Sequence, residues 1–257
     1  MSQRIEGLFL RSTKIKHNSI IVELLTKQYG RSSFIFSISS KKSKSFLFQP
    51  FHFIEFSSAY NSEKKVNRAN NVEIAFPVID IISDIRKTGY ALLLTEILNK
   101  TFHTQDKNEK LFFELKKMII SFEHQPFNPV FGIFFIKEIL IHFGIQPLSN
   151  YNTESPYFSL SDGKFTKVYD DNIEENFPYE ILNKLLGMKI DDIFVFKISS
   201  TNRRSIMSLL LSYMSYHELV NVDKLNSIKV LQSLYDWIPN WKHTYFLFST
   251  FYFLFIL

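Results

Sequence analysis

The side chains whose type and spacing could do chemistry are lysines and arginines near the N-terminus. Seven of them fall on or beside predicted loops: Arg11, Lys14, Lys16, Arg31, Lys41, Lys42 and Lys44. Lysine and arginine bind the phosphates of a nucleic-acid backbone, and the release of condensed counterions drives that binding. The seven residues therefore indicate contacts with a polyanion, although solvated surface lysines would give the same pattern.

The distribution of charge along the chain supports this interpretation. The 257 residues carry a formal net charge of +5. Residues 1–76 hold 12 Lys or Arg against 5 Asp or Glu, whereas residues 77–257 hold 18 against 20. The whole basic excess lies in the first third, which predicts a polyanion-binding module joined to a nearly neutral body.

Other kinds of chemistry find little support in the sequence. The chain has no cysteine, which excludes disulfide bonds, thiolate zinc sites and cysteine nucleophiles and fits a reducing cytoplasm. Its seven histidines do not stand at metal-ligand spacing from one another. The sequence also shows neither a Ser/His/Asp arrangement nor a glycine-rich phosphate loop. We therefore expect a cytoplasmic protein that is not an enzyme and needs no metal or other cofactor.

The elements that must position the basic residues are short strands. The β-branched and aromatic runs are Ile5–Leu10, Ser19–Thr26, Ser33–Ser39, Phe46–Phe56 and Val72–Val78. The segments between them are Lys14–Asn18, Gln28–Arg31, the lysine-rich loop Ser40–Ser45 and the polar stretch Asn61–Asn71. Five short strands with basic loops are typical of a small barrel of the OB type, which we place in residues 1–80.

After residue 80 the hydrophobic period becomes helical. Helical spacing covers Ile85–Phe102, Leu111–Phe122, Val130–Phe143, Tyr179–Met188, Arg203–Leu219 and Ser227–Trp237. Asn128-Pro129 is typical of a helix start, and Gly144 of a helix end. Tyr157–Phe165 predicts a hairpin with an Asp-Gly turn. The predicted fold class is α+β, with an N-terminal OB-fold barrel, an all-α helical domain at 81–237 and an apolar tail at 238–257.

Aromatic side chains near the basic loops could stack on unpaired bases. The candidates are Phe34, Phe36, Phe46, Phe48, Phe51 and Phe53. Alternation along a strand sends half of these rings into the barrel, and Phe is frequent throughout the chain, so core packing is favoured for each one. Phe46 and Phe48 are the best candidates for stacking because they follow the lysine-rich loop.

Several short motifs of the first third resemble the RecO family of bacterial recombination mediators. Ile5–Arg11 is similar to that family's first strand. Ser19–Thr26 followed by Tyr29–Arg31 is similar to its second strand and the turn after it. Lys41–Ser45 followed by Leu47–Pro50 resembles its basic loop and the opening of the next strand.

The resemblance continues in the helical part. Ile85–Ile97 resembles the family's first long helix, and Gly144–Pro147 resembles a corner that follows later. Tyr157–Phe165 is similar to a short family motif, and Arg203–Leu231 to its closing helices. Each motif is weak alone, but together they follow the family's order and spacing from about residue 4 to residue 236.

The resemblance implies a function as well as a fold. It implies an OB-fold domain followed by a helical domain, and it implies binding and annealing of single- and double-stranded DNA. It also implies cooperation with RecR and single-strand-binding protein in loading RecA. Many family members carry a four-cysteine zinc module, but this chain has no cysteine, so zinc is not carried over.

Two further interpretations stay open at this point. An OB-type RNA-binding or translation-associated module would show the same barrel, and a preference for RNA over DNA would favour it. The uncharged tail Tyr245–Leu257 could also make the chain a helical interaction protein or a membrane-peripheral one. We expect no membrane partner, because a bilayer span needs about 20 apolar residues and this tail is shorter.

Overall fold

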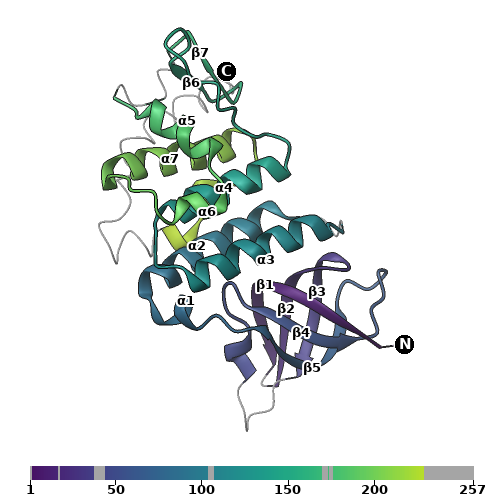
Figure 1. Ribbon diagram of the computed structural model, residues 1–257. Coiled ribbons are helices and arrows are strands. Elements are labelled where there is room, and N and C mark those ends of the chain that lie inside the picture. The colour runs from purple at the N-terminus through teal and green to yellow at the C-terminus, as the bar shows by residue number, and fades with distance from the viewer. Residues whose placement is uncertain are drawn as a thin grey trace. The chain divides into compact units, whose positions relative to one another are not determined.

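The structure, a computed structural model, describes residues 2–16, 18–37, 44–103, 107–169, 173 and 176–228 (Figure 1). Within these ranges the side chains of Lys16, Lys44 and Ser45 are not described. The chain divides into two compact units, Met1–Phe127 and Asn128–Leu257. Strands give way to helices between Phe76 and Ile79, while the helices up to Phe127 belong to the same unit as the strands. The domain boundary near residue 80 stays a prediction.

Five strands form a closed barrel at the start of the first unit. They are β1 (Gln3–Lys16), β2 (Ser19–Thr26), β3 (Gly30–Ser37), β4 (Phe53–Ser58) and β5 (Asn67–Phe76). The strand order is β1-β2-β3-β5-β4, and β4 pairs again with β1. β3 and β5 are parallel, and the other neighbouring pairs are antiparallel. This is the OB-type barrel expected from the sequence, and helices follow it, so the predicted α+β fold class is confirmed.

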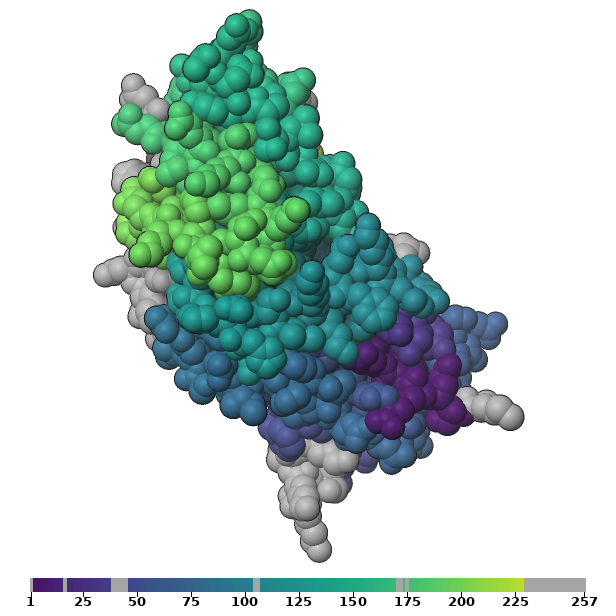
Figure 2. All heavy atoms as spheres, viewed as in Figure 1, coloured from purple at the N-terminus to yellow at the C-terminus, as the bar shows by residue number. Residues whose placement is uncertain are grey.

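Alternating side chains explain why these residues form a barrel. Buried and partly exposed positions alternate along most of β2 and along β3, which is the period of a strand with one face in a core. The inward side chains include aromatic rings that pack edge to face, such as Phe34 and Phe56, whose centroids are 4.6 Å apart. Figure 2, which draws all heavy atoms, shows residues of the first strands, in purple, at the surface. Each large apolar side chain buried inside the barrel contributes roughly 1.5–3 kcal/mol to the free energy of folding.

Several predicted strand boundaries were wrong; β5, for example, begins at Asn67 and not at Val72. The predicted turn Lys14–Asn18 is mostly strand, because β1 and β2 stay paired as far as Lys16 and Ser19. The predicted strand Phe46–Phe56 is broken by a 3₁₀ helix, η1 (Lys44–Leu47), and by Phe51, whose φ of 65° is rare for a bulky residue. His52 stabilises the turn between η1 and β4, since its Nδ1 lies 3.1 Å from the carbonyl oxygen of Leu47.

Three helices complete the first unit: α1 (Ile79–Ser83), α2 (Ile85–Thr101) and α3 (Glu109–His124). α2 and α3 run side by side in Figure 1, and Tyr90 packs against Phe122 with ring centroids 6.4 Å apart. α3 also reaches the barrel, because the ring of Phe112 lies 5.6 Å from that of Phe53 on β4. The barrel and these helices therefore share one packed interior.

A buried carboxylate links the end of α3 to the start of α1. Glu123 is 5% exposed, and its carboxylate accepts the backbone N–H groups of residues 79–81 at 2.7–3.0 Å. The buried ammonium of Lys87 donates to the carbonyl oxygen of Glu123 at 2.9 Å. A negative charge at a helix N-terminus is favourable, so this arrangement holds α1 in place.

The second unit surrounds one buried helix, α4 (Val130–His142). Against α4 pack α5 (Tyr179–Gly187), α6 (Ile190–Ile193) and α7 (Ser200–Tyr216), and the unit also contains β6 (Tyr157–Ser159), β7 (Lys164–Thr166) and a 3₁₀ helix, η2 (Val222–Lys224). As predicted, the Asn128 side chain accepts the N–H of Val130 at 2.9 Å at the helix start. Gly144, with φ 73°, ends the helix as expected.

The hairpin predicted at residues 157–165 is confirmed as β6 and β7. Its Gly163 has φ 64°, in the left-handed region that favours glycine. A Cβ there would also lie 2.3 Å from the hydroxyl of Tyr213, which donates to the carbonyl oxygen of Ile145 at 3.0 Å. This position therefore requires glycine for two independent reasons.

None of the helices in the described ranges is long and apolar enough to cross a membrane. The predicted apolar tail at residues 238–257 lies outside those ranges.

Candidate nucleic-acid interface

The predicted contact residues at the β1–β2 end of the barrel lie close in the strand register. Lys16 pairs with Ser19 of β2, and Ser19 pairs with Ser37, the last residue of β3. The end of β3, which precedes the lysine-rich loop in the sequence, therefore lies near Lys16. Lys14 is exposed and makes no ion pair with any residue that the structure describes. Lys41 and Lys42 lie outside the described residues, and Lys44 is described only by its backbone, as the first residue of η1.

Arg11 and Arg31, two more of the predicted residues, share one carboxylate. The Nε of Arg11 donates to Glu23 at 2.7 Å, and the Nε of Arg31 donates to its other oxygen at 3.0 Å. Burial raises the pKa of Glu23, but the two arginines outweigh burial and leave that pKa below its usual value. Glu23 is therefore ionised at neutral pH and offsets part of the basic charge here.

Arg31 is also bound to the end of a helix. Its guanidinium donates to the Asn99 carbonyl oxygen at 2.6 Å, to the Asn99 side chain at 2.9 Å and to the carbonyl oxygen of Phe102. The last carbonyls of a helix lack partners within it, so Arg31 satisfies the end of α2. The side chain is only 14% exposed. This geometry gives Arg31 a structural role, and its contact with a polyanion stays a prediction.

Strands β1, β4 and β5 of the barrel carry a row of acidic residues. Glu6 of β1 pairs with Glu55 of β4, and Glu55 pairs with Glu73 of β5. Arg4 forms ion pairs with Glu55 and Glu73, and Lys116 of α3 forms one with Glu6. The hydrogen bond to Glu55 is the main reason that the pKa of Arg4 lies above its usual value. We call Glu6, Glu55 and Glu73 the acidic row.

The sequence analysis passed over three basic residues of the barrel. Lys64 and Lys65 lie in the loop between β4 and β5, and Arg68 lies on β5. All three are exposed, and none makes an ion pair with a described residue. They stand in the stretch Asn61–Asn71, which we interpreted only as a polar connection before the fifth strand. The Lys-Lys pair itself was the signal that could have identified them.

The aromatic candidates are mostly core residues, as favoured from the sequence. Phe34, Phe36, Phe48, Phe51 and Phe53 are all buried. Phe48, one of the two preferred for base stacking, packs instead on Phe36 with ring centroids 5.0 Å apart. Phe46 is 55% exposed, beside the lysine-rich loop. It is the one candidate of the six whose ring is open to a ligand.

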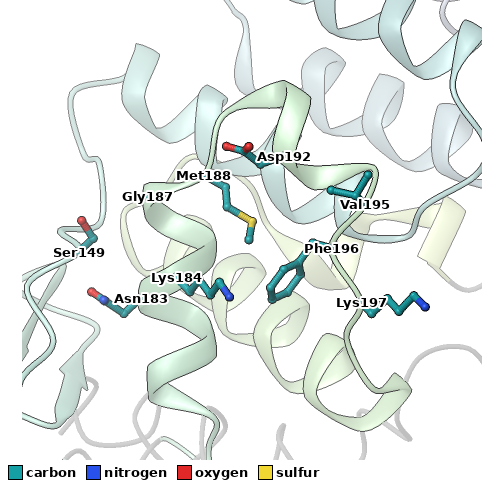
Figure 3. Close-up of a pocket in the computed structure, with 9 residues that line it drawn as sticks. All are labelled: Ser149, Asn183, Lys184, Gly187, Met188, Asp192, Val195, Phe196 and Lys197. Carbon is teal, nitrogen blue, oxygen red and sulfur yellow. The ribbon is translucent and has the colours of Figure 1, made fainter.

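The second unit contains a pocket of about 820 Å³. It lies between the end of α5 and the segment 188–197, and Figure 3 shows the residues that line it. Met188 and Phe196 give it an apolar floor, and the ammonium of Lys184 lies 5.1 Å from the centre of the Phe196 ring. Lys197 adds a second cation, and Asp192 an anion.

Two polar side chains of the same unit hold this pocket in shape. Lys137, which is 5% exposed, donates to the carbonyl oxygen of Met188 at 2.7 Å. The amide of Asn128 donates to the carbonyl oxygens of Phe194 and Phe196 at 3.1 and 3.0 Å. Both ends of the segment 188–197 are thus fixed to α4 and its start. Among the described residues, no group of three or more His, Asp or Glu side chains is placed to hold a metal ion.

Comparison with known families gives two matches along the chain. Residues 1–78 match the model described as "Recombination protein O N terminal". Residues 82–165 match the model described as "Recombination protein O C terminal". Together the two matches cover the barrel, α2–α4 and the hairpin of β6 and β7.

Curated relatives agree with these matches. A protein of Flavobacterium psychrophilum named "DNA repair protein RecO" is 26% identical over 240 residues, which is 92% of this chain and all of the relative. The Bacteroides fragilis protein of the same name, from strain NCTC 9343, is 28% identical over 245 residues, again 92% of this chain and all of the relative. One from Leuconostoc mesenteroides is 26% identical over 182 residues, which is 67% of each chain.

Proposed function

The chain belongs to the RecO family of DNA repair and recombination proteins, and from this premise we propose that its barrel binds single- and double-stranded DNA and promotes annealing of complementary strands. We also propose that the protein helps RecR to load RecA on DNA coated by single-strand-binding protein. In this proposal the protein is a mediator and performs no catalysis of its own.

One observation carries the proposal: cations within the protein already bind most acidic residues of the barrel region, whereas Lys14 at the β1–β2 end is exposed and has no ion pair with a described residue. Four of the five acidic residues of the barrel region form ion pairs, three of them in the acidic row and the fourth, Glu23, with Arg11 and Arg31. Lys14 lies exposed near the end of β1, and the lysine-rich loop follows β3 in the sequence. Uncompensated lysines at loops of an OB barrel are suited to grip phosphates.

Annealing needs little more than such a surface. Two complementary strands repel each other through their phosphates, and bound lysines lower that repulsion. Holding both strands on one protein also raises their local concentration. Both effects are electrostatic or entropic, so they weaken with added salt and require no reacting group.

The test of this function is strand annealing by the purified protein with Lys41, Lys42 and Lys44 changed to Glu. We expect annealing and DNA affinity to fall at least tenfold, because three favourable phosphate contacts become repulsive. A matched control changes Lys107, Lys110 and Lys117, on or beside α3, to Glu and alters the net charge equally. Unchanged annealing in the loop variant, or an equal loss in the control, would remove the loop from the proposal.

The partner proteins call for a different surface. We propose the pocket beside α5 as the place that receives the tail of single-strand-binding protein. Its apolar floor and its lysines suit a short peptide with apolar and acidic side chains. Binding of a labelled tail peptide should weaken at least tenfold with Lys184→Glu and stay unchanged with Lys164→Glu on β7. RecR binding is tested by pull-down with and without DNA.

The alternative of an RNA-binding module is separated by competition. We expect single-stranded DNA and RNA of equal sequence to compete for the barrel without a strong preference for RNA. A clear preference for RNA, together with failure to bind RecR, would favour the translation-associated alternative over the proposal.

A further inference from the structure

We propose that the segment Tyr245–Leu257 of this chain docks in the pocket beside α5 and competes there with the tail of single-strand-binding protein. This inference rests on the proposed function, because it assigns a regulator to the same pocket. The pocket and the segment belong to one compact unit, Asn128–Leu257. The segment lies outside the described residues, and we call it the apolar segment.

The apolar segment has a composition that favours burial. Its thirteen residues include no charged side chain, and seven of them are Phe or Tyr. An aromatic side chain removes roughly 150–250 Å² from water when it is covered. Folded proteins seldom expose contiguous apolar patches larger than a few hundred Å². We therefore expect an apolar surface of the protein to cover part of this segment.

The curated relatives have no counterpart of such a segment. Those from Flavobacterium psychrophilum and Bacteroides fragilis are matched over their whole length by 92% of this chain. The family match begins at residue 1, so the part of this chain without a counterpart lies at the other end. The inferred docking is therefore specific to this chain and is not a property carried over from the family.

The pocket offers an apolar surface next to an exposed valine. Met188 and Phe196 form the floor, and Val195 also lines the pocket (Figure 3). Val195 is 79% exposed, more than any other large apolar side chain in the part of the chain that the structure describes. A ligand that covers Val195 and the floor removes apolar area from water, which favours binding. The volume of about 820 Å³ is suited to a few side chains of the segment.

The two lysines of the pocket suit the aromatic side chains of the segment. The ammonium of Lys184 already lies 5.1 Å from the centre of the Phe196 ring. Lys197 is exposed and makes no ion pair with a described residue. An ammonium attracts the negative face of an aromatic ring, so rings of the segment can pack on both lysines. The same lysines would bind acidic side chains of a partner's tail, and the two ligands therefore exclude each other.

The chain that precedes the apolar segment is long enough to reach the pocket. The described residues end at Ile228, whose side chain is buried, and the sixteen residues 229–244 follow. Fully extended, they span roughly 55 Å, and with the helix predicted at Ser227–Trp237 they still span roughly 35 Å. A compact unit of this size has a radius of gyration of only roughly 14 Å. A ligand linked in this way has an effective concentration on the order of mM, so weak contacts are enough to fill the pocket.

The first experiment locates the apolar segment by cross-linking, which the absence of cysteine from the chain makes specific. Ser249→Cys places one thiol in the segment and removes no aromatic ring, and Val195→Cys places a second thiol at the pocket. In the matched control the second thiol is Val168→Cys, because Val168 belongs to the same unit and is 75% exposed but does not line the pocket. Each full-length double variant is treated with a short bismaleimide, and the intramolecular cross-link is quantified by mass spectrometry.

We expect the Val195 variant to cross-link roughly fivefold more than the Val168 variant, because docking raises the local concentration of the two thiols. The difference should persist at high salt, since the segment carries no charge that salt could screen. Equal yields in the two variants would overturn the inference, and so would a cross-link that forms only between two molecules.

The second experiment measures the competition with a labelled tail peptide of single-strand-binding protein. Changing Phe251, Phe253 and Phe255 to Ser should raise peptide affinity roughly fivefold, because the pocket is then free for a larger fraction of the time. Changing the same three residues to Leu keeps the segment apolar and should leave the affinity within about twofold. Unchanged affinity in the Ser variant would overturn the competition. If no variant binds the peptide while Val195 still cross-links, the proposed function of the pocket fails and the docking of the segment stands.

Discussion

Two sets of charged residues on the barrel differ in whether they are paired within the protein. On the face of the acidic row, carboxylates stand side by side across three strands, and Arg4 and Lys116 bind all three of them. Other basic residues of the barrel region have no ion pair with a described residue: Lys14, Lys64, Lys65 and Arg68. The cations beside the acidic row are bound by carboxylates of the protein, whereas the other cations are exposed to solvent.

The net charge of a segment therefore does not tell which of its cations are available to a ligand. Residues 1–76 hold a clear excess of Lys and Arg, but Arg4, Arg11 and Arg31 are engaged in ion pairs within the unit. The excess that a ligand meets comes mainly from lysines and from Arg68. A ligand therefore meets a barrel whose charged regions differ more strongly than its net charge suggests.

The largest expected effect is on stability, and it comes from replacing Arg31, a cation that is mostly buried. Arg31→Met leaves the Asn99 and Phe102 carbonyls and Glu23 without their guanidinium. We expect the free energy of unfolding to fall by roughly 2–4 kcal/mol, as for other broken pairs of low exposure. Urea unfolding measures this.

Arg11→Gln is the matched control for Arg31→Met, because Arg11 binds the same Glu23 but its side chain is 57% exposed. Its cost should stay below about 1 kcal/mol. Equal costs for the two variants would show that the contacts of Arg31 with α2 add nothing to stability.

The next largest effect is expected on DNA affinity, when basic residues at the β1–β2 end are replaced. Changing Lys14 and Lys16 to Gln removes two proposed phosphate contacts without touching the acidic row. Single-strand affinity should fall roughly ten- to thirtyfold near 0.1 M salt, with the salt slope reduced by about 1.4. Titrations at several salt concentrations check both values, and an affinity within twofold of the unaltered protein would contradict the assignment of this end.

A third variant, Asp84→Ala, removes a charge that lies outside the barrel strands, at the start of α2. The carboxylate of Asp84 begins α2 and accepts the N–H of Arg86 at 2.9 Å. The hydrogen bond from the Arg86 side chain is the main reason that the pKa of Asp84 is lowered to about 2. Asp84→Ala should cost about 1 kcal/mol at pH 7, as the loss of a helix cap usually does.

The pH dependence of that cost follows from the lowered pKa. The ionised cap stabilises the fold fully above about pH 4, the ordinary range of an aspartate, and its contribution is lost as the pH falls through about 2. The difference between Asp84→Ala and the unaltered protein should therefore shrink between pH 4 and pH 2. Unfolding curves with the same difference at every pH would exclude this role of the carboxylate.

The smallest effect would make the two sets of charged residues more alike. Changing Glu55 and Glu73 to Gln leaves Arg4 without its ion pairs and so adds basic charge to the acidic side. DNA affinity should rise less than about threefold at low salt and not at all at high salt, because screening removes interactions over distances beyond a few ångströms. Stability should change by less than about 1 kcal/mol. A large gain in affinity at high salt would mean that this face binds DNA directly.

Much of the fold could be predicted because local patterns and tertiary structure agree. The alternation in Ser19–Thr26 gives β2 with its observed bounds, and Asn128 and Gly144 mark the start and end of α4 as expected. The segment around Phe51 could not be predicted in this way. Its run of aromatic residues has high strand propensity, but His52 and the packing of Phe48 hold a turn there instead.

The sequence predicted the kind of site, a basic surface on the barrel, but not which basic residues are bound by other parts of the protein. Charge along the sequence located the basic third, but it could not show that Glu23 binds Arg31 or that Arg31 reaches α2, since those partners lie far apart in sequence. Lys64, Lys65 and Arg68 were missed because they stand in a polar stretch that carries no hydrophobic period. The position of Arg68 beside Ile35 follows only from the parallel pairing of β3 and β5.

The acidic row has a consequence for how the protein meets its ligand. Because the acidic row and the exposed cations occupy different places on the barrel, the barrel has an electrostatic direction as well as a charge. A nearby nucleic acid would rotate the barrel before contact, so that a larger share of collisions begins in a binding orientation. The paired glutamates would then contribute to the speed of association without ever touching the DNA.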